Sequence, residues 1–103
     1  MTPVVKNNIN KIQDACKKYS VTQLYLFGSA AGDHFSAESD IDFLVSYKRD
    51  QEGLPAEGFD YFDLLFLLEE ITGRKVDLVV SDAIRNKYLK QRVEEQKMLL
   101  YAA

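Results

Sequence analysis

Three short apolar segments, separated by longer stretches with helical spacing, constrain the fold of this chain more than any other feature. They cover residues 23–27, 40–47 and 76–80. Runs of about four to eight apolar residues, bounded by turn residues, are typical of buried β-strands. Because the intervening stretches have the periodicity of helices, the pattern predicts a small mixed β-sheet covered by helices, an α/β or α+β fold.

The predicted helices follow from apolar residues that recur every three or four positions. The first helix is expected over residues 2–20 and the second over residues 60–72. A final helical region is expected to begin at a cap provided by Ser81 or Asp82. We expect this region to continue through residues 98–101, so that the predicted order is helix, strand, strand, helix, strand, helix.

Length and composition limit the class of protein. The 103 residues suffice for a single domain, 1–103, with one modest core. No apolar run approaches the ~20 residues of a membrane-spanning helix, and polar residues interrupt the N-terminus too early for a signal peptide. Cys16 is the single cysteine, and these features together predict a cytoplasmic protein without a disulfide. The net charge of −3 argues against binding of long nucleic acid, whereas a small anion bound through a metal cation is compatible with it.

Three aspartates in the predicted strands carry the clearest chemical signal. Asp40 and Asp42 are two positions apart on one strand, so their side chains share a face and their Cα atoms lie roughly 6.6 Å apart. Two carboxylates about 4 Å apart repel by ~4 kcal/mol near a protein surface, so such a pair normally binds a cation or retains a proton. Asp77 can join them if strand 76–80 lies beside strand 40–47. Three oxygen donors, together with substrate phosphates, can hold two Mg²⁺ ions.

Gly28 and Ser29 follow directly after the first predicted strand. A glycine at the end of a strand lets the backbone approach a ligand closely. If Ser29 begins a helical turn, its N–H group and hydroxyl can hold phosphate oxygens. The two residues therefore predict a binding site for the phosphates of a nucleotide.

Together these residues resemble the signature of the minimal nucleotidyltransferases, the short branch of the DNA polymerase β superfamily. The family pattern is a strand that ends in Gly-Ser, an interval, an Asp-x-Asp motif and a lone Asp on a later strand. In this chain the interval of ten residues separates Gly28-Ser29 from Asp40-Ile41-Asp42, and Asp77 is the later aspartate. The resemblance covers nearly the whole chain and implies a nucleotidyltransferase fold similar to the polymerase β palm.

The resemblance implies Mg²⁺-dependent transfer of a nucleoside monophosphate, AMP if ATP is the substrate, to an acceptor hydroxyl. It assigns metal binding and catalysis to Asp40, Asp42 and Asp77, with Asp77 helping to activate the acceptor. It assigns binding of ATP or another nucleoside triphosphate to Gly28 and Ser29. Short relatives are commonly paired with helical HEPN-type toxins and in some pairs adenylylate a tyrosine of that partner, so the resemblance also implies an antitoxin role.

The chain departs from the family pattern at one place. Family members often carry an Arg and then a Gly shortly after Gly-Ser, where this chain has Gly32 and Asp33. The departure removes a possible contact to phosphate. Two basic pairs, at residues 48–49 and 74–75, border predicted strands and are expected to be solvated strand ends.

Two other functions remain open from the residues. The chain could be a binding module that inhibits a helical partner by contact, since 103 residues leave little material to enclose a base or position an acceptor. Residues 98–101 could supply contact surface for such a partner, although packing on the sheet is the stronger expectation. An enzyme acting on a metabolite such as an antibiotic ranks lowest, because larger relatives of that kind carry an additional acceptor-binding domain.

Overall fold

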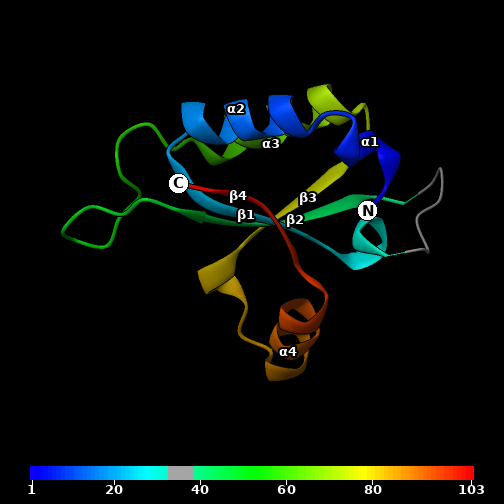
Figure 1. Cartoon of the computed structure of the whole chain (residues 1–103). Coiled ribbons are helices and arrows are strands. Elements are labelled where there is room, and N and C mark those ends of the chain that lie inside the picture. The colour runs from blue at the N-terminus through cyan, green and yellow to red at the C-terminus, as the bar shows by residue number, and fades with distance from the viewer. Residues whose placement is uncertain (33–38) are drawn as a thin grey trace.

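The computed structural model describes residues 1–32 and 39–103, which form a four-stranded sheet with helices on both faces (Figure 1). The neighbours of the first strand both run antiparallel to it, and the other pair of adjacent strands is parallel. The mixed sheet predicted from the sequence is therefore confirmed. Its strands, in the spatial order β3-β2-β1-β4, are β1 (Val21–Phe27), β2 (Ile41–Tyr47), β3 (Val76–Val80) and β4 (Met98–Ala102).

The first predicted helix is divided into two. Helix α1 (Pro3–Lys6) and helix α2 (Ile9–Lys18) are separated at Asn7 and Asn8. The side chain of Asn8 donates a hydrogen bond to the Val4 carbonyl at 2.7 Å. Asparagine competes in this way with backbone hydrogen bonds, which explains why the continuous apolar stripe does not produce a continuous helix.

Helix α3 (Tyr61–Thr72) agrees with the prediction at both ends. The carboxylate of Asp60 accepts a hydrogen bond from the backbone N–H of Asp63, as an N-cap residue should. Gly73 ends the helix with a left-handed φ of 66°. None of the helices in residues 1–32 and 39–103 has the length and apolar content to span a membrane.

The predicted start of the last helix is wrong. Ser81 and Asp82 belong to a short 3-10 helix, η2 (Ser81–Ala83), and their side chains have other partners. The Ser81 hydroxyl lies 2.8 Å from that of Ser46, and Asp82 pairs with Arg49 at 2.6 Å. Helix α4 (Lys87–Gln96) instead begins after Asn86, whose side-chain oxygen accepts hydrogen bonds from the N–H groups of Tyr88 and Leu89.

The predicted end of that helix is also wrong, because residues 98–102 form strand β4. This strand pairs with the edge of β1 that β2 leaves open. Its burial alternates as in a strand, with Leu99 55% exposed and Leu100 5% exposed. Pairing with β1 satisfies a row of backbone hydrogen bonds, and this tertiary gain outweighs the helical preference of Met and Leu.

The main core lies between the sheet and helices α2 and α3. Ile41, Phe43 and Val45 point into it and are fully buried, as the alternation in strand 40–47 predicted. Leu44 and Val93 are also buried but lie outside this core. They mark the opposite face of the sheet, which α4 covers (Figure 1).

Candidate active site

The register of the sheet brings two of the predicted aspartates side by side. Asp42 of β2 is the direct neighbour of Asp77 of β3 in the parallel pair. Directly paired residues of adjacent strands point to the same face of a sheet. Leu44, two residues from Asp42, belongs to the face that α4 covers, so both carboxylates lie on the α4 side of the sheet.

The pKa of Asp42 shows that the charges of the other two aspartates act on its carboxyl group. Burial, followed by the negative charges of Asp77 and Asp40, raises the pKa of the Asp42 carboxyl from 3.8 to about 6. Asp77 is exposed on the edge strand, so the cost of burying a charge falls on Asp42.

The carboxylates have the composition of a site for a hard divalent cation. In the part of the chain that the structure describes, no three His, Cys, Asp or Glu side chains stand ready to hold a metal ion. The donors are nevertheless all oxygen atoms, which Mg²⁺ prefers. The raised pKa of Asp42 identifies a carboxylate whose negative charge lacks compensation, and a divalent cation would supply it.

A basic residue outside the predicted site fixes the segment that carries Asp40. The guanidinium of Arg74 donates a hydrogen bond to the Ser39 carbonyl at 2.7 Å. The N–H of Ile41 donates to the Lys75 carbonyl at 3.0 Å. These bonds hold the backbone on both sides of Asp40 against the start of β3, so residues 74–75 do more than form a solvated strand end.

Gly28 occupies a position where a larger residue does not fit. Its φ of 71° is left-handed, and a Cβ atom placed on it would overlap the Oδ2 atom of Asp42. The contact follows from the antiparallel register, in which Phe27 lies opposite Asp42. The strand therefore ends with its backbone pressed against the carboxylate, and Gly28 begins the short 3-10 helix η1 (Gly28–Ala31) that contains Ser29.

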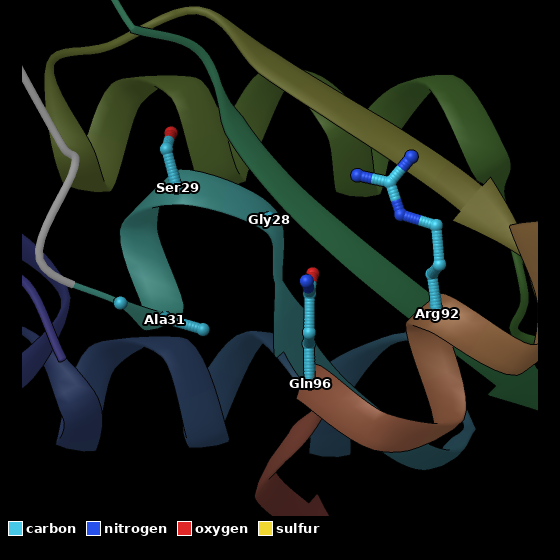
Figure 2. Close-up of a pocket in the computed structure, with 6 residues that line it drawn as sticks. Gly28, Ser29, Ala31, Arg92 and Gln96 are labelled. Carbon is cyan, nitrogen blue, oxygen red and sulfur yellow. The ribbon is translucent and has the colours of Figure 1, made fainter.

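A pocket of about 450 Å³ opens beside this bend. From η1 and its end, the pocket is lined by Gly28, Ser29, Ala31 and Gly32, and from α4 by Arg92 and Gln96. Figure 2 shows both α4 side chains extending toward the side on which Gly28 and Ser29 lie. The aspartates do not line this pocket themselves, and Asp42 borders it through its contact with Gly28.

Arg92 and Gln96 are the site residues that the sequence analysis missed. They are four positions apart and so lie on one side of α4, which is a signal that the sequence contains. Their relation to Ser29 depends on the path of α4 across the sheet, and that path follows from strand β4, which was not predicted. Asp33, named in the sequence analysis, lies outside the described residues.

The arrangement brings two kinds of chemical group together at one end of the strands. The aspartates provide oxygen ligands for cations, and the Gly28–Ser29 bend with Arg92 provides polar and positive groups for an anion. A phosphate-bearing ligand that carries a divalent metal matches both halves of the site.

Comparisons with known proteins agree with this chemistry. The family model described as a nucleotidyltransferase domain matches residues 9–100. A Methanocaldococcus jannaschii protein named as a protein adenylyltransferase is 41% identical over 78 residues, covering 76% of this chain and 75% of the relative. A second protein of that organism with the same designation is 36% identical over 92 residues, covering 88% and 89% of the two chains.

Solved structures extend the comparison to the fold. A minimal nucleotidyltransferase superimposes with a TM-score of 0.70 at 23% identity, covering 91% of this chain and 90% of that one, and this supports the fold alone. A toxin–antitoxin structure determined with AMP-PNP superimposes with a TM-score of 0.68 at 26% identity. That alignment covers 93% of this chain and 74% of the solved chain.

Proposed function

The chain belongs to the nucleotidyltransferase domain family, and on this premise we propose that residues 1–103 form one domain that transfers AMP from ATP, with Mg²⁺, to a hydroxyl group of a protein. The observation that carries the proposal is the pairing of Asp42 with Asp77 beside the Gly28–Ser29 bend. A substrate of this kind brings phosphates to the bend and metal ions to the carboxylates. ATP is abundant in the cytoplasm, which is where we propose that the protein acts.

Each predicted site residue has a role in this proposal. Asp40, Asp42 and Asp77 hold Mg²⁺, which when bound neutralises the charge that develops on the phosphates. Gly28 and Ser29 hold the triphosphate. The acceptor oxygen forms a bond to the α-phosphorus while the bond to the β-phosphate oxygen breaks and pyrophosphate leaves. Asp77 accepts the proton of the hydroxyl group, because its carboxylate is the exposed one of the adjacent pair.

The shape of the site supports a protein as the acceptor. A volume of about 450 Å³ falls in the ordinary range for small-ligand pockets, and it suits a nucleotide better than a nucleotide with a second substrate. Asp77 lies on the edge strand, where a large molecule can approach it from solvent. The names of the M. jannaschii relatives and of the toxin–antitoxin neighbour support a protein as the acceptor and an antitoxin role for this chain. We propose a tyrosine of a HEPN-type toxin as that acceptor, in keeping with the family resemblance of the sequence.

Label transfer tests the proposal directly. The purified chain is incubated with Mg²⁺, ATP labelled on the α-phosphate and the protein encoded by the neighbouring gene. We expect label on the partner, at a tyrosine, and none when Asp40 and Asp42 are both replaced by alanine. Glu70→Ala is the matched control, because Glu70 is exposed on α3, the helix on the other face of the sheet. Equal labelling by the double variant would refute the assignment of the site.

A second candidate function, inhibition of the partner by contact alone, is favoured by one surface feature. Phe62 and Phe66 are 63% and 60% exposed on α3, and their ring centroids are 6.4 Å apart. Exposed aromatic pairs of this kind are typical of protein interfaces. If the Asp40→Ala, Asp42→Ala variant still neutralises the toxin fully while a Phe62→Ser, Phe66→Ser variant does not, contact is sufficient.

A further inference from the structure

We propose that Arg92 of α4 binds the β- and γ-phosphates of the nucleoside triphosphate and then the departing pyrophosphate. This inference rests on the proposed function, since it names the part of that substrate which Arg92 contacts. Arg92, on helix α4, would supply the positive charge for the phosphates that the segment after Gly28-Ser29 does not provide.

The position of Arg92 is the first argument. Its side chain lines the same pocket as Gly28, Ser29 and Gln96, and α4 packs against η1. In Figure 2 the guanidinium of Arg92 extends from the helix toward the side of the pocket where Gly28 lies. A polyphosphate held at the bend would therefore have Arg92 on its other side.

The distribution of charge is the second argument. The sequence contains no Lys or Arg between Gly28 and Asp42, so this segment carries no permanent positive charge. Of the six described residues that line the pocket, Arg92 is the one with a charge. Leaving pyrophosphate gains negative charge as the bond to the α-phosphorus breaks, and a fixed cation beside it stabilises that change.

The availability of the guanidinium is the third argument. In the described parts of the chain Arg92 makes no hydrogen bond or ion pair, whereas Arg49 is paired with Asp82 and Arg74 bonds to the Ser39 carbonyl. The neighbouring acidic groups of α4 have other partners: Glu95 accepts from Gln91 at 3.3 Å and Glu94 pairs with Lys97 at 2.8 Å. The five N–H donors of Arg92 are thus free for a ligand.

The chemistry of arginine matches the ligand. The guanidinium is planar and permanently charged, and it can donate two parallel hydrogen bonds to one phosphate. Lysine would retain the charge without this paired geometry. Replacement of Arg92 by lysine and by glutamine therefore separates the contribution of the charge to binding from that of the bidentate hydrogen bond.

Calorimetric titration in the presence of Mg²⁺ tests the inference, using AMP-PNP, pyrophosphate and AMP as probes. We expect Arg92→Gln to weaken binding of AMP-PNP and of pyrophosphate about 10- to 100-fold, with binding of AMP within about 2-fold of the original. The affinity of Arg92→Lys for AMP-PNP and for pyrophosphate should lie between that of the original chain and that of Arg92→Gln. Lys90→Gln is the matched control, because Lys90 is exposed on the same helix and does not line the pocket.

Two results would overturn the inference. One is an affinity of Arg92→Gln for AMP-PNP equal to that of Lys90→Gln. The other is a loss of affinity for AMP and for AMP-PNP by the same factor, as a general disturbance of the pocket would produce. Melting temperatures of all variants show whether the fold is intact. If the unaltered chain fails to bind AMP-PNP with Mg²⁺, the proposed function itself is wrong, whereas labelling of the partner with no effect of Arg92→Gln would reject the role of Arg92 alone.

Discussion

Replacement of Asp42 by asparagine should stabilise the protein while it abolishes nucleotidyl transfer. Asp42 is the carboxyl whose pKa is raised to about 6, first by burial and then by the charges of Asp77 and Asp40. Asparagine has nearly the same shape and carries no charge at any pH. Stability and activity should thus change in opposite directions, as expected where charges are gathered for function at a cost to the fold.

The magnitude follows from the pKa difference. Moving the pKa from 3.8 to about 6 corresponds to about 3 kcal/mol of free energy of unfolding when the carboxyl is fully ionised. Because the side chain retains some contact with water, we expect a gain of about 1–3 kcal/mol for Asp42→Asn. Below pH 4 the carboxyl is protonated in both folded and unfolded states, so the variant should gain little there. Between pH 4 and 6 the unfolded state ionises first, and the stabilising effect of the substitution should grow to its full size above pH 6.

Urea denaturation from pH 4 to pH 8, with a chelator present, measures this difference. The quantity to compare is the variant minus the original chain, since other carboxyl groups contribute equally to both. Mg²⁺ in place of the chelator should stabilise the original chain at pH 7.5 and leave Asp42→Asn unchanged. A difference that does not vary with pH, or that matches the Glu70→Gln control, would show that the charge of Asp42 carries no cost.

Three further outcomes are expected. Gly28→Ala should destabilise the fold by ~1–3 kcal/mol more than Gly53→Ala, as measured by urea denaturation. Both glycines have left-handed φ angles, but only at Gly28 does the new methyl group meet the Asp42 carboxylate. Equal losses of stability would contradict that contact. Asp77→Asn should lower the pKa of Asp42 toward its usual value in an NMR titration, since it removes a neighbouring negative charge, and an unchanged pKa would place the two carboxylates farther apart. Burial raises the pKa of the Cys16 thiol to about 12, so a thiol reagent at pH 8 should modify Cys16 only after unfolding, and rapid reaction of the native protein would refute the burial.

The parts of the fold that could be predicted are the strands whose own residues alternate between buried and exposed positions. The alternation in residues 40–47 separated Asp42 from the buried Phe43, and the structure has the same separation. The Gly-Ser pair, the Asp-x-Asp motif and Asp77 each occur at a strand end or within a strand, so their approach required only that β3 lie beside β2. The sheet brings Asp42 and Asp77 into register.

The parts that could not be predicted depend on contacts between distant segments. Residues 98–102 contain Met, Leu and Ala, which form helices readily, and pairing with the open edge of β1 makes them a strand. The position of α4 depends on the same pairing. Ser81 and Asp82 resemble helix caps in sequence, but hydrogen bonds to Ser46 and Arg49 occupy them in the structure.

A known strand β4 would have placed α4 on the face of the sheet that carries Asp42 and Asp77. The connection from β2 to β3 passes through α3 toward one edge of the sheet, and the connection from β3 to β4 returns through α4 toward the other edge. Crossovers between parallel strands are right-handed in nearly all proteins, so connections that travel in opposite directions lie on opposite faces. The position of Arg92 above the site therefore follows from topology once the last strand is recognised.

The path of α4 makes the pocket beside the Gly28–Ser29 bend sensitive to the geometry of the entire sheet. This helix is joined through short segments to β3 and β4, which are the two outermost strands. A change in sheet twist alters the span between those strands, and the helix that bridges them must shift with it. Substitutions far from the bend can therefore change the shape of this pocket without altering a residue that lines it.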